Sequence, residues 1–172
     1  MSIATLNTRS LHKHIDDVIQ DEDIMDNMVI CFQECHLINP PTNTALCKFN
    51  FSLAYSVHGV ITCIDKSIQT EITKTYCNNK IEIIITNLYF QQPICILNLY
   101  IAPLTPLSTI IESITIARME SKQDNCILVI IGDFNIDMCT NNKKCRLLID
   151  HMKTLQLQEI THKLCLQKKR II

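Results

Sequence analysis

CILVIIGDFN, residues 126–135, is an unbroken apolar run that ends abruptly in polar residues. A run of this length, rich in β-branched residues, predicts a strand buried on both faces, which places Asp133 and Asn135 at the strand end. Strand ends are where a rigid scaffold presents functional side chains. Gly132 is one of 2 glycines in the chain, the other being Gly59, and is expected where no side chain fits. The stretch thus predicts a core strand and one corner of a functional site.

Length and composition indicate one domain with a sizeable core. The chain has 172 residues, 47% of them hydrophobic, and a formal net charge of −1 at pH 7. Residues 1–164 are expected to form this domain, whereas residues 165–172 fit no core pattern and resemble a non-native tail. The nearly neutral charge argues against a broadly basic nucleic-acid-binding surface, although it allows a local basic groove.

Targeting signals are not evident in the sequence. The N-terminal residues lack a positively charged segment followed by a long apolar one, and no apolar run approaches membrane-spanning length. These patterns predict a soluble intracellular protein with no membrane partner and no stable protein partner. If the protein acts on DNA, the nucleus is its expected location.

The 10 cysteines are open to more than one interpretation. A disulfide framework is typical of short secreted chains, but several cysteines here lie inside apolar, strand-like runs, and a free cysteine behaves as a small buried hydrophobe. Free buried thiols are therefore the favoured interpretation. Zinc is the weaker alternative, because neither candidate group has paired Cys-x2-Cys spacing. The two groups are Cys31, Cys35 and His36, and Cys139, Cys145 and His151.

Hydrophobic periodicity predicts a chain of mixed strands and helices. Strands are expected at residues 2–6, 28–32, 49–57, 60–64, 80–90, 94–100 and 126–131, with the start of another at 157–160. Helices are expected at residues 11–19, 106–119 and 143–155. Ser10 is the expected N-cap of the first helix, and Pro106 is expected in the first turn of the second. The acidic residues between 16 and 23 lack calcium-loop spacing and indicate a solvated helix face and exit loop.

Polar residues recur at the ends of four predicted strands. In chain order they are Asn7, Glu34, Asn98 with Tyr100, and Asp133 with Asn135. This ordered set resembles the endonuclease/exonuclease/phosphatase superfamily, the group of DNase I and the apurinic-site endonucleases. The segments LNTRSL, FQECHL and IGDFN, which begin at residues 6, 32 and 131, look most like endonuclease domains of mobile elements such as non-LTR retrotransposons and Helitron-like transposons.

The resemblance covers the chain from Ile3 to about Thr161 and implies its architecture. Members of this superfamily have an α/β (α+β) fold built as a four-layer sandwich, with two mixed sheets packed face to face and helices outside. We therefore expect a DNase I-like four-layer α/β sandwich. The implied activity is hydrolysis of phosphodiester bonds in DNA.

Phosphodiester hydrolysis gives each polar residue a possible role. The reaction needs charge neutralisation at the phosphate and an activated water, and Mg²⁺ (or Mn²⁺) supplies the first through one or two protein oxygens. Glu34 fits as the carboxylate ligand and Asn7 as a neighbouring ligand. Asp133 can orient the attacking water, and Asn135 can donate a hydrogen bond to the phosphate. The resemblance implies that Tyr100 supplies a hydroxyl to the phosphate or leaving group.

Substrate contacts are expected from Asn98 and from basic residues near the strand ends, Arg9 first and also Lys13 and Lys143-Lys144. Each candidate also has an ordinary interpretation. Any of the basic residues can be a solvated surface side chain, and polar residues at strand ends commonly form turns or stay at the rim of the core.

The chain departs from the superfamily pattern near its end. Neither a Ser-x-x-Asp-type segment nor a terminal Asp-His pair follows the last predicted helix, and His162 has no aspartate before it. We therefore expect the C-terminal strands of the fold to be missing, as in a truncated or frame-shifted endonuclease, and the incomplete catalytic set leaves both an active and an inactive enzyme open. The alternatives are a phosphatase or phosphodiesterase acting on a small or lipid substrate, and a non-catalytic relic.

Overall fold

The computed structural model describes residues 1–39, 41–121, 126–137 and 142–157. It divides into two compact units, Met1–Ile136 and Asp137–Ile172, which are described separately. The strands are β1 (Ile3–Asn7), β2 (Val29–Gln33), β3 (Phe49–Ala54), β4 (Val60–Asp65), β5 (Thr70–Cys77), β6 (Ile81–Leu88), β7 (Ile94–Ile101) and β8 (Ile127–Asp133). The helices are α1 (Leu11–Gln20), α2 (Glu22–Met25), a 3-10 helix at Thr44–Leu46, α3 (Leu107–Glu120) and, in the second unit, α4 (Lys143–Thr154).

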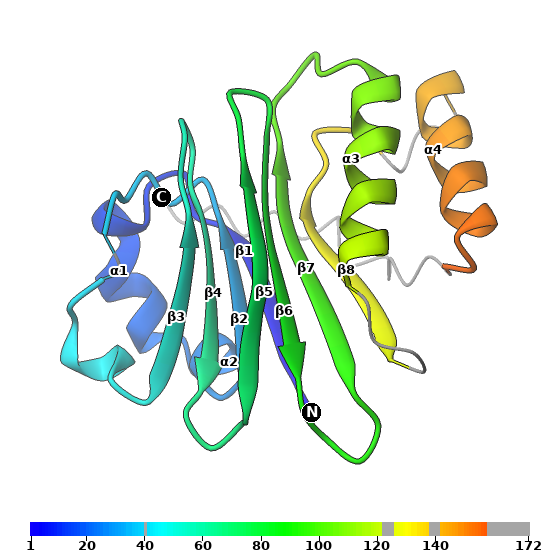
Figure 1. Ribbon diagram of the computed structural model, residues 1–172. Coiled ribbons are helices and arrows are strands. Elements are labelled where there is room, and N and C mark those ends of the chain that lie inside the picture. The colour runs from blue at the N-terminus through cyan, green and yellow to red at the C-terminus, as the bar shows by residue number, and fades with distance from the viewer. Residues whose placement is uncertain (40, 122–125, 138–141, 158–172) are drawn as a thin grey trace. The chain divides into compact units, whose positions relative to one another are not determined.

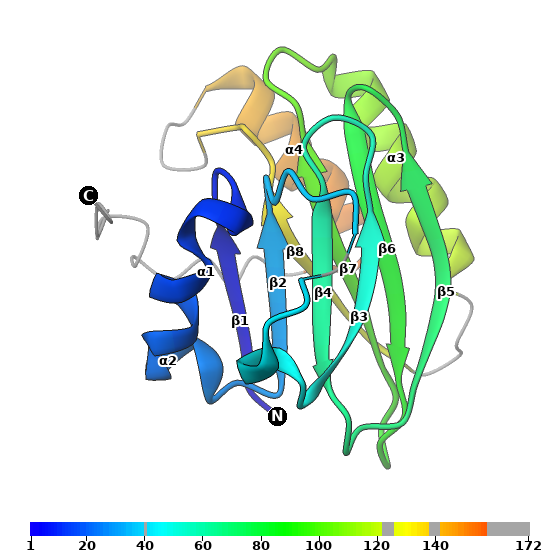
Figure 2. The ribbon, with the colours of Figure 1, turned by 90° about the vertical axis from the view of Figure 1, so that its left-hand side faces the viewer.

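The strands of the first unit form two mixed sheets. The first has the order β1-β2-β4-β3, with β1 and β2 parallel and the other pairs antiparallel. The second has the order β5-β6-β7-β8, with β7 and β8 parallel and the other pairs antiparallel. The sheets pack face to face, α1 and α2 cover the outer face of the first, and α3 covers the outer face of the second (Figure 1 and Figure 2). This four-layer α/β sandwich confirms the expected fold class.

Alternation along the strands decides which side chains enter the space between the sheets. On β2, Phe32 packs in one cluster with Leu11 of α1, whereas its neighbour Cys31 packs in another with Ile96 of the second sheet. The same period of two directs Gln33, the last residue of β2, between the sheets. Apolar packing in this interface therefore gives way to polar side chains at the carboxyl ends of its strands.

Strand β8 lies at the edge of its sheet. It pairs with β7 and is the last strand in the described order. Each of its residues is at least partly exposed, and Ile127 is 45% exposed. The prediction that this strand is buried on both faces is therefore wrong, because one long edge of β8 has no neighbouring strand among the described residues.

Strand β5 is not among the predicted strands. Its sequence mixes threonine, charged residues and Tyr76 without an apolar run, and most of its described side chains are exposed. An edge strand that faces solvent on one side gives a weak hydrophobic signal, which explains why the pattern did not reveal it.

Two predicted helix starts differ in detail. Ser10 precedes α1 as predicted, but its side chain makes no capping hydrogen bond, and the Leu11 amide instead bonds the Cys35 carbonyl at 3.0 Å. Pro106 is the residue before α3 rather than part of its first turn. The strand predicted at 157–160 lies almost wholly outside the described residues, and the tail at 165–172 lies wholly outside them. Of the described helices, none is long and apolar enough to cross a membrane.

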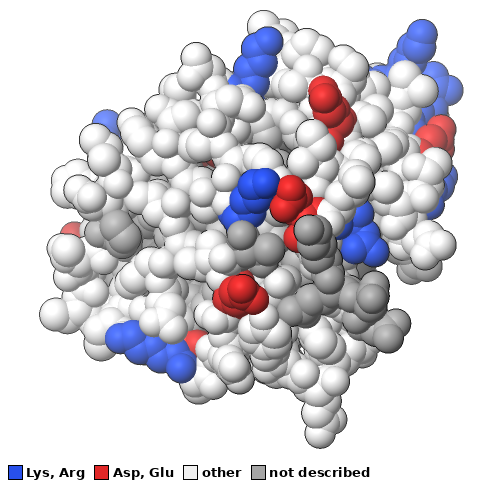
Figure 3. Space-filling view, viewed as in Figure 1, with Lys and Arg blue, Asp and Glu red and all other residues white. Residues whose placement is uncertain are grey.

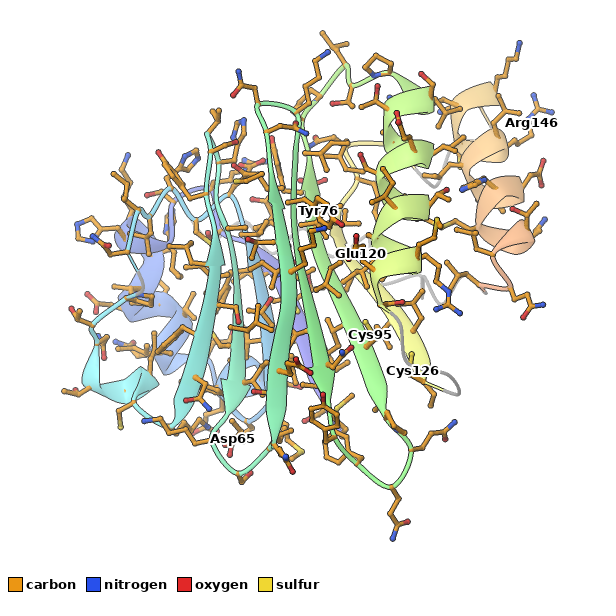
Figure 4. The ribbon with its side chains drawn as sticks, viewed as in Figure 1. Asp65, Tyr76, Cys95, Glu120, Cys126 and Arg146 are labelled. Atoms are coloured by element: carbon orange, nitrogen blue, oxygen red, sulfur yellow. The ribbon has the colours of Figure 1, made fainter. Side chains whose placement is uncertain are left out.

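The described cysteines are free thiols, as the sequence favoured. Burial raises the pKa of Cys31 and of Cys95 to about 12, so these thiols are poor nucleophiles at neutral pH. Figure 4 shows Cys95 on β7 and Cys126 at the start of β8, on neighbouring strands. Of the two zinc candidates, the second includes Cys139, which lies outside the described residues.

Candidate active site

The carboxyl ends of β1 and β2 in one sheet meet those of β7 and β8 in the other. Register places Asn7 beside Gln33 and Tyr100 beside Asp133. Between the sheets, the Asn7 side-chain amide donates a 2.7 Å hydrogen bond to Oδ2 of Asp133, joining residues 126 positions apart in the sequence. The fold therefore brings together most of the strand-end residues that the sequence singles out.

Hydrogen bonds around Asp133 leave acceptor capacity free. Its Oδ1 accepts a 2.8 Å bond from the Asn135 backbone amide, while its Oδ2 accepts from Asn7. The Asn135 side-chain amide donates to the Ile101 carbonyl at 2.8 Å, and Oδ1 of Asn7 accepts from the Arg9 amide at 3.2 Å. A carboxylate oxygen has two lone pairs, and so has an amide oxygen. Asp133 can thus still accept a proton from a water, and Asn7 can still bind a cation.

Tyr100 lies in β7 with only 2% of its surface exposed. Burial raises the pKa of its hydroxyl to about 12, and the negative charges of Glu34, Asp133 and Glu82 act in the same direction. A hydrogen bond with the Asn135 side chain acts in the opposite direction. The phenol therefore stays protonated at neutral pH and is available as a hydrogen-bond donor.

Asn98 is placed differently from its expected role as a substrate contact. It is fully buried, its Oδ1 accepts a 2.7 Å bond from the Gln33 side chain, and its Nδ2 donates to Ile61 O at 2.9 Å and Thr62 Oγ1 at 3.2 Å. Both ends of the amide are thus used inside the protein. In the structure Asn98 therefore bridges the two sheets and has no exposed surface.

Gln33 is a site residue to which sequence reasoning gave no role. It is 2% exposed and connects the Asn98 amide to the Thr5 hydroxyl, which donates to Gln33 Oε1 at 3.2 Å. Buried polar side chains of this kind need such partners. The sequence indicates this role of Gln33 only through the polar character of the residue within the segment FQECHL.

The loops after β1 and β2 are held together in unusual backbone conformations. Ser10 N donates to Glu34 O at 2.8 Å, and Thr8 N donates to Gln33 O at 2.9 Å. Five non-glycine residues near the strand ends have positive φ: Arg9 (48°), Ser10 (114°), Glu34 (52°), His36 (50°) and Asn135 (46°). Such conformations are costly and cluster at functional sites. Their concentration here is an independent sign that this edge of the sandwich is functional.

The acidic side chains at this edge lack basic partners. In the part of the chain that the structure describes, no lysine or arginine forms an ion pair with Glu34 or Asp133. No group of three or more metal-ligating side chains occurs there either. The carboxylate oxygens of Glu34 and the amide oxygen of Asn7 are donors that suit a hard divalent cation, which needs only one or two protein oxygens.

Most of the face shown in Figure 3 is uncharged, and the basic side chains on it have acidic ones among them. Lys74, for example, pairs with Glu120 at 3.0 Å. Arg9, in contrast, is exposed and directly follows the β1 end of the candidate site.

Comparisons with known proteins bear on the fold of the chain. No protein-family model matches the chain, and no curated protein sequence matches it. Among solved structures, the endonuclease domain of TRAS1, a telomere-specific non-LTR retrotransposon, matches with a TM-score of 0.70 at 15% identity, covering 92% of this chain and 73% of that one. A humanized TDP2 from D. rerio gives 0.59 at 11% identity, with 92% and 67% covered. The AP endonuclease LMAP from Leishmania major gives 0.56 at 13% identity, with 88% and 65% covered.

The chain has the DNase I-like fold. The resemblance seen in the strand-end motifs is thereby confirmed at the level of fold. The DNase I-like chain spans 65% to 73% of the length of these three structures. Roles for individual residues therefore rest on the geometry described above.

A buried carboxylate organises one rim of the candidate site. Glu82 of β6 is 1% exposed, and its Oε1 accepts bonds from the amides of Ser56, Val57 and His58 at 2.7, 2.9 and 3.2 Å. The Ser56 hydroxyl also donates to Oε1 at 2.9 Å, and the Gly59 amide donates to Oε2 at 2.6 Å. Glu82 thus holds the β3–β4 turn in place. Its signal in the sequence is one charged residue inside an apolar run.

Replacing Glu82 with glutamine is expected to destabilise the fold by about 3 kcal/mol, because a side-chain NH₂ then faces buried backbone donors that have lost their acceptor. Urea unfolding measures the change. Glu112→Gln on α3 is the matched control, since Glu112 is exposed, and it should change stability by less than about 0.5 kcal/mol. Equal unfolding midpoints for the two variants would contradict the assigned role of Glu82.

Proposed function

We propose that this chain is a Mg²⁺-dependent endonuclease that hydrolyses phosphodiester bonds in DNA. The observation that carries the proposal is the 2.7 Å contact between Asn7 and Asp133, which joins the two sheets. It lies beside the protonated Tyr100 hydroxyl and near Glu34, whose carboxylate has no basic partner among the described residues. An acceptor for a water proton, a neutral donor and free acidic oxygens are what this hydrolysis needs.

Each residue has one task in this mechanism. Glu34 would hold Mg²⁺, with Asn7 as a neighbouring oxygen donor, and the bound cation supplies charge neutralisation at the phosphate. Asp133 orients the attacking water and accepts its proton, because both carboxylate oxygens keep a free lone pair. The Tyr100 hydroxyl donates a hydrogen bond to a phosphate oxygen, and the Asn135 side chain, which bonds that hydroxyl and the Ile101 carbonyl, positions it.

DNA is the proposed substrate, and Arg9 is its proposed phosphate contact. The structural neighbours include an endonuclease domain of a retrotransposon and an AP endonuclease, which favours nucleic acid over a small phosphate ester. Arg9 and Lys13 are exposed beside the β1 end of the site, where basic side chains can bind phosphates. An origin in a mobile element and a nuclear location belong to the same proposal.

Nicking of supercoiled plasmid tests the proposal. The wild-type chain is expected to nick with Mg²⁺ and to stop when EDTA is added. Glu34→Gln removes one ligand charge and is expected to raise the Mg²⁺ concentration for half-maximal rate by about tenfold or more. Glu112→Gln, an exposed carboxylate on α3, is the matched control and should behave as wild type. If the wild type does not nick, or Glu34→Gln nicks with an unchanged Mg²⁺ requirement, the proposal is wrong.

A further inference from the structure

A histidine without an assigned role lies against Tyr100. The ring centroid of His58 is 4.5 Å from that of Tyr100, with the planes tilted by 36°. On its other side, the His36 ring is 5.6 Å away, and the His36 amide donates to the His58 carbonyl at 2.7 Å. His58 is half-buried, so one part of its imidazole remains accessible. It therefore occupies the rim of the candidate active site.

In the β3–β4 turn, residues 56–59, the His58 imidazole is the one hydrogen-bond donor that Glu82 does not already bind. The amides of residues 56–59 and the Ser56 hydroxyl all bond to Glu82. The imidazole, in contrast, has no hydrogen-bond partner among the described residues. A backbone that is held this firmly positions the ring with little freedom, and pre-organised donors contribute most to binding and catalysis.

The chemistry around His58 suggests what it binds. The Tyr100 ring against which His58 packs carries a neutral hydroxyl donor, and two donor-bearing rings side by side suit the oxygens of a phosphate group. An imidazole has at least one N–H in either tautomer and in either charge state, so this role does not depend on pH.

We infer that His58 contacts the substrate, donating a hydrogen bond to a phosphate oxygen next to the one that Tyr100 binds. This inference rests on the proposed function, because the phosphate is that of the DNA strand. It adds His58 to the candidate site, although His58 belongs to none of the strand-end motifs. The competing role for His58 is packing against Tyr100 alone.

Three variants separate a donor from a packing residue. His58→Phe keeps a ring against Tyr100 but has no donor, and it is expected to nick at least about tenfold more slowly than wild type, since hydrogen bonds to charged groups are strong. His58→Gln restores an N–H without the ring and is expected to recover most of the rate. His14→Phe on α1, where His14 lies 3.5 Å from Asp17, is the matched control and should nick as wild type. Wild-type nicking by His58→Phe would overturn the inference.

A second measurement keeps the inference testable if the wild type does not nick. The imidazole resonances of the full chain can be followed by NMR while a 12-base-pair DNA duplex is added in EDTA, where hydrolysis cannot occur. We expect the His58 signals to shift and the His14 signals to stay. A His58 shift without nicking would refute the proposed turnover and support the contact. Unmoved His58 signals would overturn the contact whether or not the protein nicks.

Discussion

Asp133→Asn is expected to reduce Mg²⁺-dependent nicking by about 10³-fold, the size typical of losing a positioned general base. The amide that replaces the carboxylate cannot take a proton from the attacking water. It also presents an NH₂ group either to the Asn7 amide at the Oδ2 position or to the Asn135 backbone amide at the Oδ1 position. The variant should nevertheless fold, because Asp133 is partly exposed at the end of an edge strand.

Asp65→Asn is the matched control for this change. Asp65 is also the last residue of a strand, β4, and its Oδ1 accepts from the Ser67 amide at 2.9 Å, as Asp133 accepts from Asn135 at 2.8 Å. Figure 4 shows it at the opposite end of the strands from the β3–β4 turn. If Asp133 only closes a turn, both variants will nick at the wild-type rate. Equal rates would therefore contradict its role as a base.

Plasmid nicking at saturating Mg²⁺ measures both variants. Far-UV circular dichroism should be the same for the two, so that a loss of rate is not a loss of fold. If Asp65→Asn also lost its activity, the effect would arise from strand-end turns in general.

Local sequence patterns predicted which residues end the strands, but not how the strands are arranged. The apolar run of β8 reads as a strand buried on both faces, yet β8 is an edge strand of its sheet. Strand order depends on pairings between distant segments, which a local pattern does not contain. The same limitation explains why β5 was not predicted, since its exposed Lys74 and Thr75 give no apolar signal.

The sequence pattern also did not predict how deeply each side chain is buried within the sandwich. Asn98 and Tyr100 both face the space between the sheets, two residues apart on β7, but Asn98 lies far enough inside to have no exposed surface. The two-residue period of a strand predicts on which face of the sheet a side chain lies, but not how far that side chain is from the edge of the sandwich. Likewise, His58 gave no motif, because its place beside Tyr100 depends on Glu82 from another strand. Residues that act through long-range contacts are the ones that pattern analysis missed.

Gly132→Ala is expected to lower the free energy of unfolding by more than about 4 kcal/mol, which is an exceptional effect for one methyl group. Gly132 has φ of +140°, a conformation that side chains rarely adopt. An added Cβ would overlap the carbonyl oxygen of Leu99 and lie 2.8 Å from its carbonyl carbon and 2.9 Å from its nitrogen. The obstacle is backbone, which cannot rotate away.

Gly59→Ala is the variant with which the stability of Gly132→Ala should be compared. Gly59 also has a positive φ, +81°, but its nearest neighbour is the Tyr55 side chain, 3.1 Å from the added Cβ and free to move. We expect a loss of only about 1 to 2 kcal/mol there. Urea unfolding of the two variants, with solubility and circular dichroism where Gly132→Ala does not fold, measures the difference. Equal stabilities would show that the close approach of β8 to β7 is wrong.

The Gly132 prediction also connects stability to the site. Leu99 and Gly132 are register partners, and the next pair along the two strands is Tyr100 and Asp133. Relief of the clash would move the end of β8 away from β7 and separate the proposed base from the proposed phenol donor. Any folded fraction of Gly132→Ala should therefore nick far more slowly per molecule than wild type, whereas folded Gly59→Ala should keep Asp133 in place. A single glycine would then hold together the strand pairing and the chemistry that follows it.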